Sequence, residues 1–138
     1  MFRSHAFILL FTCFSVGMMA QLTLTIEIRN LRNCSGIVHG ELRDEKAQSV
    51  ASVSRSIVEN QCCIVFEKFP PGKYAFQFIH DENSNKKLDT NWIGIPNEGF
   101  GYSNNPSLLS GPPTLKRTLF DLSQSTKIQC KTIYLFSK

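Results

Sequence analysis

The chain has 138 residues, and its 15 lysines and arginines only slightly outnumber its 11 aspartates and glutamates. This length allows one ordinary domain but is too short for two independent cores. The basic residues are scattered and have no interleaved aromatic side chains, so the composition argues against nucleic-acid binding.

The first twenty residues have the pattern of a secretory signal peptide. Arg3 and His5 precede an apolar run over residues 6–16, and small residues then lead to a cleavage point after Ala20. A buried or membrane-spanning helix is the alternative, but the run is too short to cross a bilayer comfortably. No other segment of the sequence is apolar enough to span a membrane. We therefore expect a signal peptide at 1–20, a mature domain at 21–138, and a location in the periplasm, at the cell surface or outside the cell.

The mature chain has the pattern of short strands separated by turns. Alternation of apolar and polar residues, as in Leu22-Thr23-Leu24-Thr25, is typical of a half-buried strand. The strands are expected at residues 21–30, 37–43, 62–67, 73–80, 118–122 and 127–136, with a short strand or turn near 50–58. Pro70, Pro71 and Gly72 predict a tight hairpin turn. No long helical period is present. The pattern predicts an all-β fold, a single antiparallel β-sandwich of immunoglobulin-like type with one long ordered loop.

Four cysteines follow the expected cleavage point, namely Cys34, Cys62, Cys63 and Cys130. An even number in an exported chain favours disulfides. A bond between Cys62 and Cys63 is the least expected pairing, because neighbouring residues on a strand point to opposite faces. We expect one of these two to bond to Cys34 or Cys130. The spacing does not fit a zinc site, and a free-thiol or redox role is the alternative.

The segment after the fourth of these main strands has the spacing of a calcium-binding loop. Oxygen-bearing side chains occupy positions 1, 3, 5 and 9, as they do in short loops that fold around calcium. The candidate ligands are the side chains of Asp81, Asn83, Asn85, Asp89 and Glu98 and the backbone carbonyl of Lys87. Two positions depart from the pattern: Lys86 replaces the glycine of position 6, and Trp92 replaces the glutamate of position 12. Alternatively, the Asp and Asn side chains cap their own backbone and no ion binds.

Three kinds of function are consistent with these residues. A binding role would use His80 and the aromatic residues Trp92, Phe100 and Tyr102 to hold a carbohydrate or a protein, unless the aromatics simply pack the loop onto the sandwich. An enzyme, a small hydrolase for example, would use His80 with the loop carboxylates. A carrier would hold a small apolar ligand inside the sandwich. No nucleophile motif, phosphate loop or metal triad is present in the sequence. We therefore expect a non-catalytic extracytoplasmic binding or structural module, with calcium as a possible ligand of the loop.

The same segments also resemble a known family. They are Phe-Pro-Pro-Gly-Lys-Tyr-Ala at residues 69–75, His-Asp-Glu-Asn at 80–83, Lys-Leu-Asp-Thr-Asn at 87–91, and Gly-Ile-Pro-Asn-Glu-Gly-Phe-Gly-Tyr-Ser-Asn-Asn at 94–105. Together they resemble the exported bacterial domain-of-unknown-function family 2141, over nearly all of the mature chain. The resemblance implies a small secreted β-sandwich, similar to transthyretin-like and carboxypeptidase-regulatory-like domains. It implies no particular activity. Members of the family usually carry glycine at the position of Lys86.

Overall fold

The computed structural model describes residues 20–136 of the chain. The expected signal peptide, apart from Ala20, lies outside the described residues. Within those residues, no helix has the length and apolar character needed to cross a membrane.

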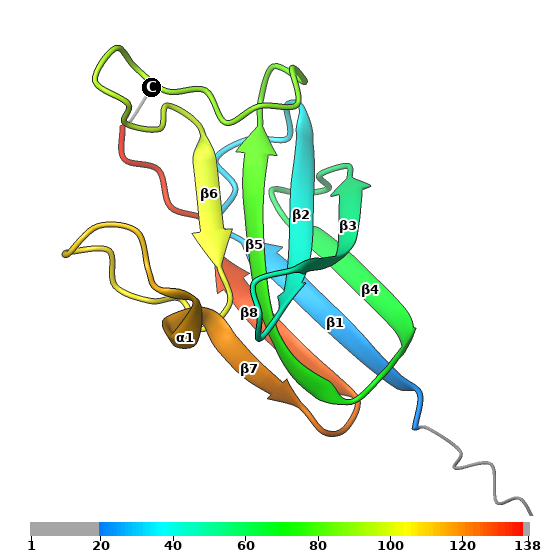
Figure 1. Ribbon diagram of the computed structural model, residues 1–138. Helices are drawn as coiled ribbons and strands as arrows, with labels where there is room; N and C mark the ends of the chain where they lie inside the picture. Colours follow the sequence, from blue (N-terminus) through cyan, green and yellow to red (C-terminus); the bar gives the residue numbers. More distant parts are fainter. Residues whose placement is uncertain (1–19, 137–138) are drawn as a thin grey trace, which may run out of the picture.

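The described part of the chain is built almost entirely of strands (Figure 1). They are β1 (Leu22–Arg29), β2 (Ile37–Asp44), β3 (Ser49–Arg55), β4 (Cys62–Phe69), β5 (Gly72–Asp81), β6 (Gly99–Tyr102), β7 (Leu119–Leu122) and β8 (Thr126–Lys131). One short helix, α1 (Leu115–Thr118), precedes β7. The predicted all-β fold is confirmed.

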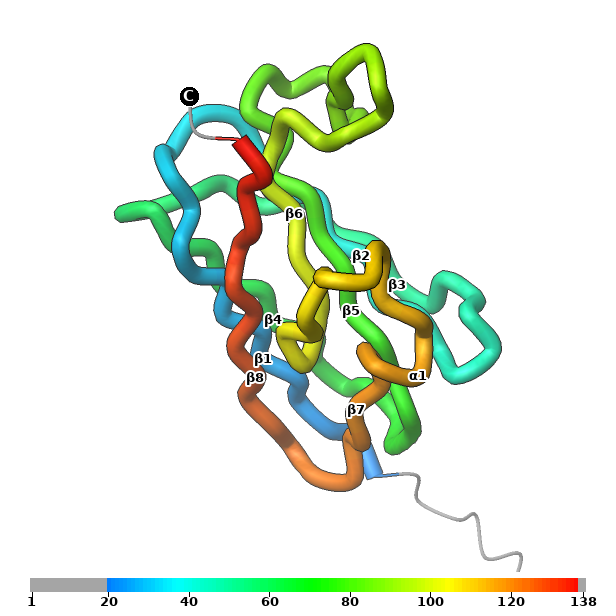
Figure 2. The backbone as a smooth tube through the Cα atoms, turned by 90° about the vertical axis from the view of Figure 1, so that its left-hand side faces the viewer, coloured from blue at the N-terminus to red at the C-terminus, as the bar shows by residue number. Residues whose placement is uncertain are grey.

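The strands form two sheets that lie against one another, as the two views in Figures 1 and 2 show. The smaller sheet has the order β4-β1-β8. The larger sheet has the order β3-β2-β5-β6, and β7 pairs with the first half of β5 while β6 pairs with its second half. All pairs are antiparallel except β1 with β8, which run parallel. The predicted antiparallel β-sandwich is confirmed, with β1 and β8 as one parallel pair among the antiparallel ones.

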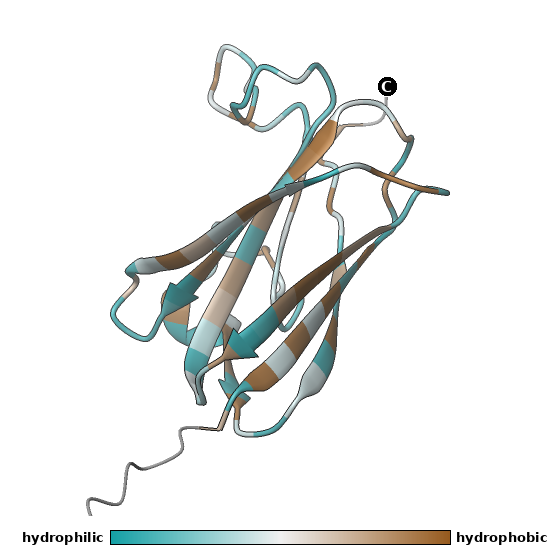
Figure 3. Ribbon diagram, turned by 90° about the vertical axis from the view of Figure 1, so that its right-hand side faces the viewer, coloured by the Kyte–Doolittle hydropathy of each residue, from teal (hydrophilic) through white to brown (hydrophobic). Residues whose placement is uncertain are grey.

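The core lies between the inner faces of the two sheets. Alternate residues of β1 and β2 point inward, among them Leu24, Ile26 and Ile28 on β1 and Val38 on β2, and each of these is completely buried. Figure 3 shows the result as alternating hydrophobic and hydrophilic bands along the strands. Burying these side chains supplies most of the driving force for folding. The residues between them, such as His39 on β2, face outward, where they can contribute to a binding or catalytic site.

Strand β6 was not among the predicted strands, because two of its four residues are glycine and the segment resembles a loop. The structure explains both glycines. A Cβ at Gly99 would lie 2.5 Å from the ring of Tyr134, and one at Gly101 would lie 2.5 Å from the ring of Phe78. These positions therefore admit no side chain, because neighbouring rings pack directly against the backbone. The last strand also ends at Lys131 rather than near residue 136.

The predicted disulfide is not formed. Cys34, Cys62, Cys63 and Cys130 are all free. Both Cys62 and Cys130 pair with Ile28 of the central strand β1, one from each side. Two strand spacings separate their backbones by about 9.6 Å, which exceeds the ~7 Å limit for a disulfide. Cys34 instead contacts Asn60, whose backbone N–H donates to the thiol at 3.3 Å.

The four thiols should differ in reactivity in the native protein. Burial raises the pKa of Cys62 to about 11, with a smaller contribution from Cys63, and burial raises that of Cys130 to about 12. Under native conditions we expect an alkylating reagent to modify the exposed Cys34 and Cys63 rapidly and the buried pair only after unfolding. The number of thiols in the mature chain, residues 21–138, measured without reductant in denaturant, should be four. A count of two or fewer would contradict this arrangement.

Candidate functional site

The long loop from Glu82 to Glu98 connects β5 to β6 and stands at one end of the larger sheet, next to the last described residues of the chain (Figures 1 and 2). Asp81 is the last residue of β5, one residue beyond the predicted end of this strand. The backbone at Gly36 passes very close to the end of β5. A Cβ at Gly36 would lie 1.8 Å from the carbonyl oxygen of Asp81. Gly36 also has a φ of 72°, so only glycine is suited to this crossing.

The side chain of Asp81 is the central acceptor of the loop and is completely buried. Its Oδ1 accepts the backbone N–H of Asn85 at 3.1 Å, and its Oδ2 accepts that of Lys86 at 2.6 Å. His39 of β2 contacts the same Oδ2 through Nε2 at 3.1 Å. Burial alone would raise the pKa of Asp81, but these three donors outweigh it and lower the pKa below its usual 3.8. Asp81 is therefore a carboxylate at neutral pH.

The remaining predicted calcium ligands mostly bond to each other. The side-chain amide groups of Asn83 and Asn85 donate to the carboxylate of Asp89 at 2.6 Å and 2.9 Å. Their side-chain oxygens accept backbone N–H groups two residues further on, at Asn85 and Lys87. These are the Asx turns that the sequence suggested as the alternative to an ion. Amide N–H groups thus face Asp89 where a cation would be needed.

Lys86 has a φ of 65°, the left-handed conformation that a calcium loop requires at its sixth position. The strain expected from a lysine at this position is therefore present. It is offset by the short hydrogen bond from the Lys86 N–H to Asp81. Lys86 therefore has the backbone conformation of the sixth position, while the side chains of the loop are satisfied by hydrogen bonds to one another.

Glu98 closes the loop from the opposite side. Its side chain is buried, and its two carboxylate oxygens accept the backbone N–H groups of Glu82 at 2.9 Å and Asp89 at 3.1 Å. Glu82 in turn accepts Nε of Arg32 at 2.7 Å, and the Arg32 guanidinium also donates to the carbonyl of Asn97 at 3.2 Å. Within residues 20–136, no three His, Cys, Asp or Glu side chains are grouped so that they could hold a metal ion.

His80, the histidine that the sequence suggested for catalysis or binding, is buried and occupied on both sides. Its Nε2 contacts the carbonyl of Ser35 at 2.8 Å, and its Nδ1 contacts the hydroxyl of Tyr134 at 2.6 Å. Because a carbonyl only accepts, Nε2 carries the proton and Nδ1 accepts from the tyrosine. The role of His80 is structural, so the enzyme hypothesis built on it lacks an accessible base.

The three aromatic residues of the predicted binding loop lie in different places. Trp92 is 94% exposed and sits on a tight turn, in which the side chain of Asn91 accepts the N–H groups of Ile93 and Ile95. Phe100 is buried and Tyr102 partly buried on β6, where their rings meet edge to face with centroids 6.1 Å apart. Trp92 therefore lies alone at the exposed tip of the loop, whereas Phe100 and Tyr102 form an aromatic pair on the sheet.

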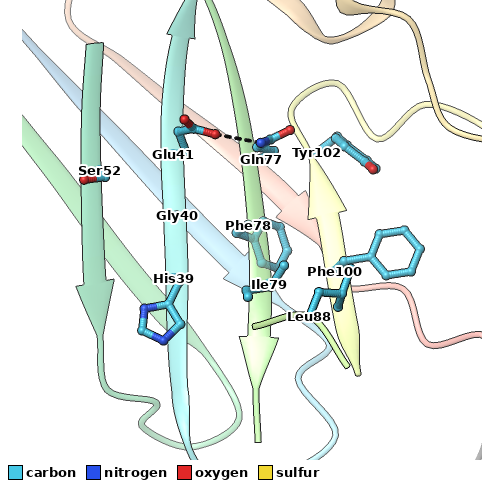
Figure 4. Close-up of a pocket in the computed structure, with 10 residues that line it drawn as sticks. All are labelled: His39, Gly40, Glu41, Ser52, Gln77, Phe78, Ile79, Leu88, Phe100 and Tyr102. Carbon is cyan, nitrogen blue, oxygen red and sulfur yellow. Dashed lines mark hydrogen bonds between the residues drawn. The ribbon is translucent and has the colours of Figure 1, made fainter. Parts of the chain in front are cut away.

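This aromatic pair borders a hollow of about 380 Å³ on the outer face of the larger sheet (Figure 4). The residues that line it are His39, Gly40, Glu41, Ser52, Gln77, Phe78, Ile79, Leu88, Phe100 and Tyr102. We call it the outer groove. One side carries hydrogen-bonding groups, and Gln77 donates from Nε2 to Glu41 at 2.7 Å. Burial alone would raise the pKa of Glu41, but hydrogen bonds from Arg43, Ser49 and Gln77 lower it, so Glu41 is a carboxylate that forms an ion pair with Arg43.

Two residues at this face were missed in the sequence. His39 contacts Ser54 of β3 through Nδ1 at 2.7 Å, in addition to its contact with Asp81. The outward position of His39 could be read from the alternation of β2. The pairing of His39 with Ser54 depends on the register of β2 against β3, for which no turn signal in the sequence is specific enough.

Comparison with known proteins identifies a family. The model of a family described as "Uncharacterized protein conserved in bacteria (DUF2141)" matches residues 26–129. No curated protein and no solved structure matches the chain. The expected likeness to transthyretin-like and carboxypeptidase-regulatory-like domains therefore stays a prediction.

The buried carboxylate of Asp81 should make the stability of the protein depend on pH. Its folded pKa lies below the usual 3.8, so its stabilising contribution is present above about pH 4 and is lost as the pH falls through the folded value. We expect Asp81→Asn to lower the free energy of unfolding at pH 7 by about 1.5–3 kcal/mol, the range for hydrogen bonds to a charged group. Denaturant unfolding of both proteins between pH 7 and pH 2 should show this difference shrinking with acidification.

The exposed carboxylate of Asp121 on β7 provides a matched control. The same substitution there should change stability by less than about 0.5 kcal/mol at every pH. An Asp81→Asn variant as stable as the natural protein at pH 7 would contradict the central position of this carboxylate.

Proposed function

The chain belongs to the DUF2141 family of uncharacterised bacterial proteins, and we propose that it is an extracytoplasmic binding module that holds its ligand in the outer groove. The observation that supports this proposal is the composition of the groove. It combines an apolar side, formed by Ile79, Leu88 and Phe100, with a polar side that includes Glu41 and Gln77. Binding sites for small molecules commonly have this mixture of apolar surface and a few placed polar groups.

The chemistry of the groove fits a neutral carbohydrate. A pyranose ring has one apolar face and a rim of hydroxyl groups, which matches an aromatic side chain next to hydrogen-bonding groups. Tyr102 supplies an aromatic ring and a hydroxyl, while Glu41 and Gln77 are held in position by their mutual hydrogen bond. A fixed pair of polar side chains reduces the entropic cost of ordering them around a ligand. This arrangement supports a sugar over a charged or fully apolar ligand.

The extracytoplasmic part of the proposal rests on the signal-like N-terminal sequence. A location in the periplasm or at the cell surface would bring the groove into contact with the glycans and secreted polymers of the bacterial envelope. The earlier alternative, a carrier with an apolar cavity between the sheets, has less support. The inner space is occupied by large side chains such as Phe76 and Leu42, and the hollow that the structure offers lies on the outer face.

Binding can be tested with a defined set of neutral sugars, for example glucose, galactose, N-acetylglucosamine and cellobiose, by titration of ¹⁵N-labelled protein followed by NMR. We expect at least one sugar to shift the amide signals of β2, β5 and β6, because these strands form the groove. Tyr102→Ala should weaken binding about tenfold, the effect of losing one aromatic contact worth about 1.4 kcal/mol.

Trp92→Ala is the matched control, since Trp92 lies on the loop tip and not in the groove. The variant should bind the sugar with unchanged affinity. If Trp92→Ala abolished binding while Tyr102→Ala did not, the ligand site would be the loop tip, and the proposal for the groove would be wrong.

As a subsidiary proposal, we suggest that the loop also takes up calcium weakly. Two observations support it: Lys86 already has the left-handed backbone of the sixth position, and Asp89 and Glu98 line a common hollow of about 370 Å³. To bind the ion, Asn83 and Asn85 would have to turn their side-chain oxygens toward Asp89 in place of their amide groups. This rearrangement costs hydrogen bonds, which agrees with the weak affinity usual for extracellular calcium sites.

Calcium binding predicts a rise in the thermal unfolding midpoint. At a dissociation constant of about 10⁻⁴ to 10⁻³ M, 10 mM calcium would stabilise the fold by about 1.4–2.7 kcal/mol relative to a chelator. The rise should disappear in Asp89→Asn and persist in the control Asp121→Asn. Trp92 is the single tryptophan of the chain, so its fluorescence reports on the loop directly. An unchanged midpoint together with unchanged fluorescence would mean that the loop is held by its own hydrogen bonds alone.

A further inference from the structure

Three side chains on the outer face of the larger sheet form one line of hydrogen bonds. Ser54 Oγ contacts His39 Nδ1 at 2.7 Å, and His39 Nε2 contacts Asp81 Oδ2 at 3.1 Å. We infer that Ser54, His39 and Asp81 form a nucleophile–base–carboxylate array that hydrolyses carboxylic esters carrying an apolar group. This inference goes beyond the proposed binding role, which requires no reaction.

The strand register brings these three residues together. His39 of β2 pairs with Ser54 of β3 on one side and with Ile79 of β5 on the other. Directly paired residues have Cβ atoms about 5 Å apart and point to the same face of the sheet. Asp81 lies two residues beyond Ile79, so it is the diagonal neighbour of His39 on that same face. The array therefore stands on three adjacent strands, which hold it more rigidly than loops would.

The hydrogen bonds assign a role to each residue. Asp81 is an ionised, completely buried carboxylate that can only accept, so the proton of the His39 ring lies on Nε2. The carboxylate of Asp81 is held in position by the backbone N–H groups of Asn85 and Lys86. In the neutral ring Nδ1 is then the acceptor, and it faces the Ser54 hydroxyl at 2.7 Å. A serine with an adjacent base, itself oriented by a carboxylate, is the general arrangement of an activated nucleophile.

The surroundings of the array leave room for a substrate. Ser54 is exposed, and together with His39 and Lys86 it lines a second hollow of about 430 Å³. His39 also lines the outer groove, so the two hollows meet at His39, the proposed general base. In the proposed arrangement, the ester substrate has its carbonyl carbon at Ser54 and its apolar group toward Ile79 and Phe100 in the outer groove. Lys86 brings a positive charge to the hollow in which the negative oxygen of the intermediate would form.

The reaction balances without any further reactant except water. Ser54 Oγ forms a bond to the carbonyl carbon of the ester while its proton passes to His39 Nδ1. The alcohol then leaves with that proton, and the acyl group stays on Ser54. Water attacks the acyl group, giving its proton to His39, which returns it to Ser54 Oγ as the carboxylic acid departs. Asp81 stays ionised throughout and stabilises the charged ring of His39.

Two measurements on the folded mature protein test this inference. The first is labelling with a fluorophosphonate probe, followed by mass spectrometry of the digested protein. The activated hydroxyl predicts one adduct on Ser54, which should be absent from Ser54→Ala and from His39→Gln. The second is hydrolysis of p-nitrophenyl butyrate, whose rate above the buffer background should fall at least 100-fold in either variant.

Ser56→Ala is the matched control, because Ser56 follows β3 in the chain and lines a different hollow, together with Glu27 and Cys62. It should keep the rate of the natural protein within about twofold. Thermal unfolding of each variant checks that the fold is intact, since Ser54 is exposed but the His39 side chain is only 22% exposed. The absence of an adduct on Ser54 would overturn the inference, as would a hydrolysis rate that survives Ser54→Ala.

Discussion

The architecture of the site depends on one buried carboxylate. Asp81 ends the central strand of the larger sheet, where burial would normally favour its neutral form, yet three donors keep it ionised. Two of these donors are backbone N–H groups of the following loop, and the third is the side chain of His39 on the neighbouring strand. The two carboxylate oxygens of Asp81 thus fix both the turn of the loop and the orientation of the His39 side chain on the sheet face. Removing the charge would loosen both.

The loop is stabilised by polar contacts because it has little apolar material of its own to bury. Asp81 and Glu98 accept four of its backbone N–H groups from opposite sides, and Glu82 bonds to Arg32 in the segment after β1. Hydrogen bonds to charged acceptors are the stronger kind, so a loop of this composition can still be rigid. A rigid loop matters for the proposed functions, because Leu88 forms one end of the outer groove and Lys86 lines the hollow at Ser54.

Local rules were enough to predict most of the strands from sequence, whereas contacts between residues far apart in the chain could not be predicted. The two-residue alternation of β1 and β5 and the turn at Pro70 and Pro71 are local signals, and the structure confirms them. Strand β6 was missed because its glycines are required by rings from elsewhere in the chain. The expected disulfide of Cys62 or Cys63 with Cys34 or Cys130 is not formed, and β1 lies between β4 and Cys130. Contacts between distant residues also decided which histidine mattered. The sequence indicated His80, which is buried, whereas His39 has partners on two other strands.

Amide hydrogen exchange of the loop is the most direct test of the claim that buried carboxylates hold it to the sheet. The amides of Asn85 and Lys86, which donate to Asp81, and those of Glu82 and Asp89, which donate to Glu98, should exchange at least about 100-fold more slowly than in an unfolded peptide. Protection of these four amides in the natural protein, and its loss at Asn85 and Lys86 in Asp81→Asn, is the predicted result. Exchange of all four at the rate of an unfolded peptide would contradict the account.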